Sequence, residues 1–204
     1  MKLKDKVALI TGGGRGIGKA VALAYAREGA KIAICARTGS EIEQTVGEIR
    51  ALKAECAGWP CDVSLEEPVR ELLANVKQKF GRLDVLVNNA GVMTRPVPTV
   101  ELDVKKWDYT IAVNLRGLFL MTQAVLPIMM KQKSGSIINL SSTIGRGAYA
   151  NFIAYATSKW GVEGFTQTLA AEARPYRIRA NSVEPGYTMW QPNLPETAAA
   201  NPNQ

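Results

Sequence analysis

The sequence of 204 residues contains no histidine. A Ser-His-Asp triad therefore cannot form, and metal sites that need an imidazole ligand are excluded. Any proton transfer must use Tyr, Lys, Asp, Glu, Cys or Ser side chains. Cysteine is also scarce: three residues with no CxxC pair predict neither a disulfide framework nor a zinc site. We therefore expect no metal, and we interpret the cysteines as small buried hydrophobic residues.

Long apolar runs are missing as well. No stretch of about 18 uninterrupted apolar residues is present, so the sequence predicts no membrane span. The apolar stretch after the basic N-terminus is too short for a signal peptide, which favours a cytoplasmic protein. The net charge is +7, but the cations are scattered, with one modest cluster at Arg174, Arg177 and Arg179. Because nucleic-acid binding usually needs a concentrated basic stripe, we expect no nucleic-acid partner.

What the chain does contain is an alternation of short apolar runs and segments of helical period. It predicts strands at 6–11, 31–36, 57–62, 83–88, 136–141 and 176–183, and helices at 16–28, 40–53, 64–80, 102–131 and 151–173. Ser40 and Ser64 are expected to cap their helices, Ser64 in a capping box with Glu67. The helix at 102–131 is expected to be interrupted around residues 114–117 and by Pro127.

This alternation predicts an α/β fold with a parallel sheet covered on both faces. Right-handed crossovers then give a Rossmann-like, doubly wound sheet in strand order 3-2-1-4-5-6. Ligands of such sheets bind at the carboxyl ends of the strands, near the switch between strands 1 and 4. Functional residues are therefore expected directly after the predicted strands.

The first predicted strand ends in a glycine-rich turn, TGGGRGIG at residues 11–18. Glycines let the backbone approach a pyrophosphate, and the next helix offers free N–H groups and a positive dipole end. The strict G-x-G-x-x-G fingerprint is absent, whereas T-G-x-x-x-G-x-G is present; a plain strand–helix connection is the alternative interpretation. We expect a dinucleotide to contact this turn at Gly12, Gly14, Arg15, Gly16, Ile17 and Gly18.

The choice of dinucleotide is set after the second predicted strand. An NAD enzyme tends to place an acidic residue there for the ribose 2′-hydroxyl, whereas this chain has Ala36-Arg37-Thr38. Arg37 and Arg15 could both bind a 2′-phosphate, because a guanidinium matches phosphate geometry. The alternative is that both are solvated surface arginines. We favour NADP(H) over NAD(H).

Proton chemistry is indicated by Tyr155 and Lys159, which are four residues apart and therefore share a helix face. Carbonyl reduction needs a hydride and a proton for the new alkoxide. A nearby ammonium would lower the pKa of a tyrosine from its usual ~10 and ease that proton transfer. The YxxxK motif alone is weak, because six tyrosines give a chance match roughly one time in three.

With these features the chain resembles the short-chain dehydrogenase/reductase family over about residues 5–188. The resemblance is carried by the glycine turn, Asp62-Val63, the Asn88-Asn89-Ala90-Gly91 run, Asn114, Ser141-Ser142, Tyr155 with Lys159, and Pro185-Gly186, all in family order. Among the subgroups, it is most similar to bacterial 3-oxoacyl-[acyl-carrier-protein] reductases.

The resemblance implies roles for individual residues. Ser142 would hydrogen-bond the substrate oxygen, with Ser141 as its rival, while Tyr155 acts as general acid/base beside Lys159. Asn114 would hold a backbone kink and a water that relays protons to the lysine; the alternative is a helix-breaking residue without chemistry. Further cofactor contacts are implied at Asp62, Val63, Asn89, Ala90, Gly91, Tyr155, Lys159, Pro185, Gly186 and Thr188.

The C-terminal end departs from the family pattern. A typical member continues past the Pro-Gly turn with a substrate lid, another helix and a seventh strand, which is missing here. We expect a single dinucleotide-binding and catalytic domain at 1–188 and a truncated or disordered tail at 189–204. Strand 6 is then expected to be an open edge beside uncovered apolar surface.

The implied function is hydride transfer between NADP(H) and a ketone, 3-oxoacyl group or secondary alcohol. The partners expected are a small carbonyl or alcohol substrate, an acyl-carrier thioester included, and further copies of the chain in a dimer or tetramer, unless the short C-terminus prevents assembly. The alternative is a truncated nucleotide-binding module without turnover. No segment of the sequence identifies the substrate.

Overall fold

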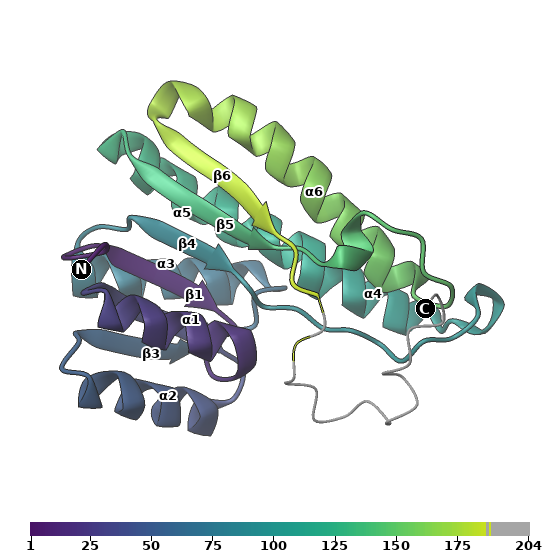
Figure 1. Ribbon diagram of the computed structural model, residues 1–204, viewed down its shortest axis with the longest axis horizontal. Helices are drawn as coiled ribbons and strands as arrows, with labels where there is room; N and C mark the ends of the chain where they lie inside the picture. Colours follow the sequence, from purple (N-terminus) through teal and green to yellow (C-terminus); the bar gives the residue numbers. More distant parts are fainter. Residues whose placement is uncertain (187, 189–204) are drawn as a thin grey trace.

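The computed structural model describes residues 1–186 and 188, which build one parallel sheet between two layers of helices (Figure 1). The strands lie in the order β3-β2-β1-β4-β5-β6, and every neighbouring pair is parallel. The predicted Rossmann-like α/β fold and its strand order are confirmed. The strands are β1 (Val7–Thr11), β2 (Lys31–Ala36), β3 (Cys56–Pro60), β4 (Val85–Asn88), β5 (Gly135–Leu140) and β6 (Ile178–Val183).

Two apolar cores form because successive side chains of a strand point to opposite faces. Ala8 and Ile10 of β1 pack with α1 (Gly16–Arg27) and α2 (Gly39–Ala51), whereas Val7 and Leu9 face the other helical layer. That second layer contains α3 (Glu66–Phe80), α5 (Gly117–Gln132) and α6 (Ile153–Ala173). Each fully buried Leu or Ile side chain stabilises the fold by about 1.5–3 kcal/mol, so this two-sided burial fixes the strand register.

The long helical segment before β5 consists of α4 (Val104–Ile111), a π-helical turn (Ala112–Arg116) and α5. The predicted interruption near residue 114 is confirmed, but Pro127 lies inside α5 without ending it, so that part of the prediction is wrong. By length and composition alone, Val104–Gln132 could cross a membrane. Its buried side chains instead pack in the protein core, among them Val113, Leu120, Met121, Val125 and Met129.

The predicted capping box before α3 is wrong. Helix α3 begins after Leu65, which makes no side-chain cap. Ser64 instead folds back on the preceding loop: its backbone N–H and its hydroxyl both donate to Asp62 Oδ1, at 3.0 and 2.7 Å. Such a local turn competes with helix capping for the same serine. Glu67 pairs with Arg70 on the exposed helix surface rather than with the backbone of residue 64.

Other boundaries differ from the prediction by a residue or two. Helix α2 begins at Gly39 after Thr38, so Ser40 lies within the first turn and is not its cap. Strand β3 covers Cys56–Pro60 rather than 57–62, and α6 begins at Ile153 rather than 151. None of these shifts moves a residue away from the carboxyl edge of the sheet.

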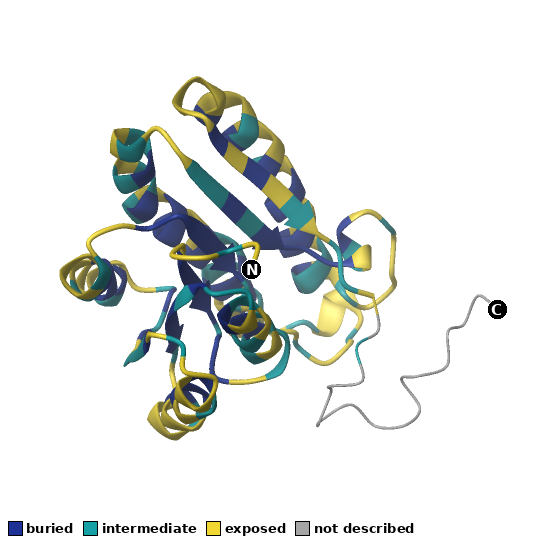
Figure 2. Ribbon diagram, turned by 60° about the vertical axis from the view of Figure 1, so that its left-hand side comes forward, coloured by how far each residue is buried: buried dark blue, intermediate teal, exposed yellow. Residues whose placement is uncertain are grey.

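Strand β6 is the edge of the sheet as far as the described residues go. Ile178 and Ala180 are buried toward α6, while Arg179 and Asn181 are exposed on the opposite face (Figure 2). The predicted open edge is confirmed for these residues, but the predicted uncovered apolar surface is mostly wrong for β6, where only Val183 is a large exposed hydrophobic residue. The predicted tail at 189–204 lies outside the described residues.

Candidate active site

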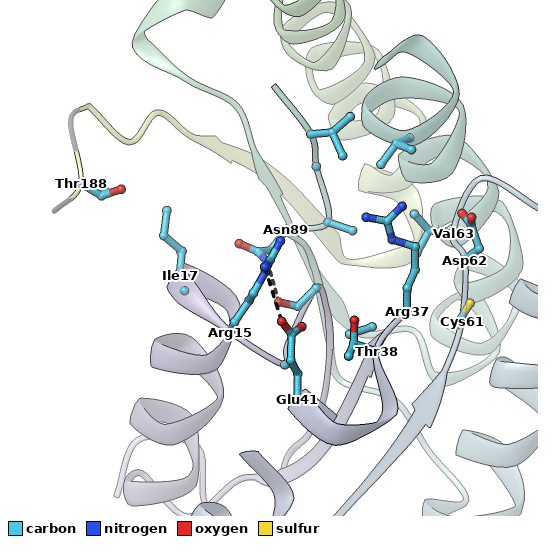
Figure 3. Close-up of a pocket in the computed structure, with 18 residues that line it drawn as sticks. Arg15, Ile17, Arg37, Thr38, Glu41, Cys61, Asp62, Val63, Asn89 and Thr188 are labelled. Atoms are coloured by element: carbon cyan, nitrogen blue, oxygen red, sulfur yellow. Dashed lines mark hydrogen bonds and ion pairs between the residues drawn. The ribbon is translucent and has the colours of Figure 1, made fainter. Parts of the chain in front are cut away.

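A cavity of about 270 Å³ lies at the carboxyl ends of β1, β2 and β4 (Figure 3). Its walls are the glycine turn after β1, the segments after β2 and β3, and the segment after β4. This is the switch point at which the sequence predicts the ligand, because β1 pairs with both β2 and β4.

Most of the predicted cofactor contacts line this cavity. The exceptions are Gly18, Tyr155, Lys159, Pro185 and Gly186. Gly18 lies beneath the turn, where a Cβ would come within 2.3 Å of the Gly12 carbonyl oxygen, so its glycine serves close packing. The predicted residues that do line the cavity are Gly12, Gly14, Arg15, Gly16, Ile17, Arg37, Asp62, Val63, Asn89, Ala90, Gly91 and Thr188.

The cavity is held open by hydrogen bonds between the ends of β1 and β4. Thr11 Oγ1 accepts from the N–H groups of Asn89 and Ala90, at 3.0 and 2.9 Å. The Asn89 side chain returns a bond, with Nδ2 donating to the Thr11 carbonyl at 2.8 Å. Gly12 leaves the strand at φ +63°, a conformation that favours glycine. The turn is thus shaped before any ligand contacts it.

The electrostatics of the cavity suit an anion. Helix α1 starts at the glycine turn with no side-chain cap and no acidic residue in its first turn, so its N–H groups and dipole remain available. Arg15 and Arg37 add two cations at the rim. Arg15 Nη1 lies 3.4 Å from Glu41 Oε1 (Figure 3), and Arg37 donates to the Tyr109 hydroxyl. These features fit the phosphates of a dinucleotide.

Six lining residues were not predicted from the sequence. Glu41 is the most consequential, because its carboxylate pairs with one of the two arginines expected to bind a 2′-phosphate. The prediction was based on the residues directly after β2, whereas Glu41 lies in the first turn of α2. The helical period of α2 could have placed it on the same side as the turn. The six residues are Ala36, Thr38, Glu41, Cys61, Val92 and Val113.

Helix α6 brings the predicted Tyr155 and Lys159 together. Lys159 Nζ lies 5.6 Å from the centre of the Tyr155 ring and donates to the Leu140 carbonyl at 2.6 Å. The lysine is only 5% exposed, which is unusual for an ammonium group. The predicted shared helix face is confirmed, and the lysine is anchored at the end of β5.

Burial controls the proton affinities of this pair. It lowers the pKa of Lys159 to about 8, although the Glu163 carboxylate opposes the change. Burial also raises the pKa of Tyr155, an effect that the Ser142 hydroxyl partly offsets. The predicted lowering of the Tyr155 pKa by Lys159 is therefore wrong for this structure, because desolvation of the phenolate outweighs the opposing hydrogen bond from Ser142.

Ser142 and Ser141 face different groups. Ser142 Oγ accepts from the Ile144 N–H at 3.2 Å, and its hydroxyl also acts on the Tyr155 phenol. Ser141 Oγ instead donates to the Lys159 carbonyl at 3.5 Å. The geometry therefore favours Ser142 over Ser141 as the serine that meets a substrate oxygen.

Asn114 occupies the π-helical turn and is buried. Its Oδ1 accepts from the Val92 N–H at 2.7 Å, and its Nδ2 donates to the Val92 carbonyl at 2.8 Å and to Ser158 Oγ at 3.0 Å. The asparagine thus connects the cavity wall at Val92 with α6 beside Lys159. The backbone irregularity implied by the family resemblance is present, and the water relay stays a prediction.

Comparisons with known proteins identify the family of the chain. A sequence model of the short chain dehydrogenase family matches residues 6–199. The chain belongs to this family. The short-chain dehydrogenase is 42% identical, over 200 residues, to the 3-oxoacyl-[acyl-carrier-protein] reductase FabG of Thermotoga maritima; the match covers 97% of this chain and 81% of the relative.

Solved structures agree as well. A xylitol dehydrogenase bound to NAD+ superposes with a TM-score of 0.90 at 35% identity, covering 92% of this chain and 72% of that one. A metagenomic short-chain oxidoreductase in complex with NADP gives 0.87 at 37% identity, covering 92% and 85%. This short-chain dehydrogenase is thus an oxidoreductase of the hydride-transfer type that uses a nicotinamide cofactor.

Proposed function

We propose that the protein transfers a hydride between NADP(H) and a ketone, 3-oxoacyl or secondary alcohol substrate, with Tyr155 as general acid/base. The observation that carries this proposal is the meeting of the Tyr155 phenol, the Lys159 ammonium and the Ser142 hydroxyl at the end of β5. The similarity to a 3-oxoacyl-[acyl-carrier-protein] reductase supports a carbonyl beta to a thioester as one substrate class.

The residues of the chain divide the chemistry between them. When bound, a nicotinamide supplies the hydride to the carbonyl carbon, or accepts it in the reverse direction. The Ser142 hydroxyl donates to the substrate oxygen and holds it beside Tyr155, whose phenol gives its proton to the new alkoxide. The Lys159 ammonium stabilises the resulting phenolate until a proton returns from solvent. A well-placed acid of this kind contributes about 10²–10⁴-fold to the rate.

The choice of NADP(H) rests on Arg15 and Arg37 at the cavity rim and on the lack of an acid directly after β2. Glu41 opposes it, since a 2′-phosphate must share Arg15 with that carboxylate. Titration of the protein with NADPH and NADH, followed by cofactor fluorescence, tests the preference. Equal affinity for the two would overturn it.

Replacing Tyr155 by phenylalanine tests the catalytic role. Tyr155→Phe should abolish NADPH oxidation over a panel of ketones and β-ketoacyl thioesters while NADPH still binds. Tyr176→Phe, a change on the 3-10 turn after α6, is the matched control and should keep full activity. Turnover by Tyr155→Phe would refute the assigned role.

A second candidate function is a nucleotide-binding module without turnover. It is favoured by the lining of the cavity, which does not include Ser142, Tyr155 or Lys159. Tight NADPH binding by the unaltered protein, with no turnover of any substrate in the panel, would support this candidate. Reduction of any one ketone would eliminate it.

We further propose that the protein is a cytoplasmic homo-oligomer with no membrane or nucleic-acid partner. Two large aromatic side chains, Phe119 on α5 and Trp160 on α6, are about half exposed, which supports self-association. Light scattering during size-exclusion chromatography tests the assembly, and a monomer at micromolar concentration would contradict it.

A further inference from the structure

Glu163 is a buried carboxylate one helical turn beyond Lys159 on α6, and the proposed reaction does not use it. We propose that Glu163 is a positioning residue that keeps Lys159 charged and ties the loops after β5 and β6 to α6. This proposal rests on the proposed function, because it takes Lys159 as the lysine that stabilises the Tyr155 phenolate. Its structural basis is independent of which carbonyl compound is reduced.

The carboxylate joins segments that are far apart in the sequence. Glu163 Oε2 accepts from Ser182 Oγ of β6 at 2.8 Å and pairs with Arg146 Nη2 at 3.5 Å. Arg146 follows the 3-10 turn Thr143–Gly145 after β5, and its Nε also pairs with Glu184 Oε1 at 2.6 Å. Glu184 directly precedes Pro185-Gly186, so the network reaches the loop after β5 and the loop after β6, both at the carboxyl edge of the sheet.

The charge of Glu163 is maintained despite its burial. Burial alone would raise the pKa of the carboxyl, but the hydroxyls of Ser141 and Ser182 and the Arg146 guanidinium lower it below its ordinary value. The group is therefore ionised at neutral pH. A buried anion four residues from a buried ammonium on one helix face stabilises the charged lysine.

The surroundings of Lys159 contain few other charges. Tyr155 lies on α6, the same helix as Lys159, and β5 contributes the neutral Leu140 carbonyl. The charged Arg146 and Glu184 lie in the segments that follow β5 and β6. The π-helical turn contributes the neutral side chain of Asn114, bonded to Ser158. Among the described residues, Glu163 is the one charged side chain that shifts the pKa of Lys159, and it raises it.

Changes to Glu163 and to Arg146 must then act on Lys159 in opposite directions. Glu163→Gln keeps the shape and removes the anion, so the ammonium loses its stabilising partner. Arg146→Gln removes the cation that pairs with the same carboxylate, so the full charge of Glu163 acts on Lys159 and the ammonium becomes more stable. A structural role of Glu163 in the loops alone would not produce these opposed effects.

The test is an NMR titration of the full-length protein with ¹³C-labelled lysine, in which the Lys159 signal is assigned by its loss in Lys159→Met. Glu163→Gln should lower the Lys159 midpoint by about 1 pH unit, Glu163→Asp should recover most of that shift, and Arg146→Gln should raise the midpoint. Ser182→Ala, which removes a hydrogen bond but no charge, is the matched control and should change it by less than about 0.3 unit.

The same variants separate this proposal from the proposed function. If a carbonyl substrate is turned over, the basic limb of the pH–rate profile should move with the NMR midpoint in each variant. A midpoint in Glu163→Gln equal to that of the unaltered protein, or a lowered midpoint in Arg146→Gln, would overturn the positioning role even if the enzyme is active. Arg146 is exposed, so its variant remains informative if Glu163→Gln fails to fold.

Discussion

Replacing Lys159 by methionine should make the protein more stable while removing its proton chemistry. Burial lowers the pKa of Lys159 from 10.5 to about 8, a difference of about 2.5 units. At ~1.36 kcal/mol per unit, holding the ammonium in the folded protein at pH 7 costs about 3 kcal/mol. Methionine keeps the volume and the apolar stem but loses the hydrogen bond to the Leu140 carbonyl, worth about 1–2 kcal/mol.

The net gain for Lys159→Met is therefore about 1–2 kcal/mol at pH 7, or roughly 2–8 °C in melting temperature for a chain of this size. The gain should depend on pH in a defined way. Because the pKa is lower in the folded than in the unfolded state, the unfolded chain binds more protons between about pH 8 and pH 10.5. The stability of the unaltered protein therefore rises with pH in that window, and the advantage of the variant shrinks.

Urea denaturation of both proteins at pH 7 and pH 10 measures this difference in unfolding free energy. A variant that is less stable at pH 7, or a difference that does not change between the two pH values, would refute the reasoning. Lys105→Met, at an exposed position on α4, serves as the control and should show neither effect.

Three further changes have expected outcomes. Gly18→Ala should destabilise the protein and abolish cofactor binding, because its Cβ would come within 2.3 Å of a carbonyl oxygen in the turn; calorimetry and NADPH titration measure both. Asp84→Asn should cost about 1–3 kcal/mol in urea denaturation, since the buried carboxylate pairs with Arg82. Burial opposes ionisation of Asp84, but Arg82 and other partners lower its pKa overall, so this stability should be lost as pH falls through the lowered pKa. Glu41→Gln should tighten NADPH binding by about 2–5-fold, because an exposed ion pair that occupies Arg15 is worth up to ~1 kcal/mol.

Each change has a matched control. Gly39→Ala meets nothing within 4 Å, and equal damage from it would contradict the packing argument for Gly18. Asp108→Asn lies on the surface of α4, and an equal loss there would show that the Asp84 result is not specific. Glu43→Gln, an exposed change on α2, should leave NADPH affinity unaltered; a similar gain would point to net charge rather than to Arg15.

The fold could be predicted from the sequence because its main determinants are local and repetitive. Each apolar strand is followed by a segment of helical period, and right-handed crossovers leave few ways to order six parallel strands. The position of the cavity follows from that order. The Tyr155–Lys159 contact was predictable for the same reason, since a spacing of four residues is a property of the helix itself.

What could not be predicted depends on tertiary contacts or on competition between local ones. Ser64 bonds to Asp62 rather than capping the N-terminus of α3, and the sequence contains both possible partners. The pairing of Glu41 with Arg15 requires α2 to lie against the glycine turn. The pKa of Tyr155 depends on how much of its ring the neighbouring elements cover, which no spacing rule supplies. The network around Glu163 likewise joins segments separated by many residues.

The π-helical turn Ala112–Arg116 restricts how this chain can change in length. A π turn contains about one residue more than an α turn, and each residue of a helix rotates the chain by ~100°. Removing one residue from this turn would rotate the whole of α4 relative to α5, bringing the buried Thr110 to the surface and taking Tyr109 away from Arg37. The π-helical turn thus sets the rotation between α4 and α5, whose contact faces would otherwise not align. Single-residue deletions should therefore be accepted in the loop before α4 but not within the π-helical turn.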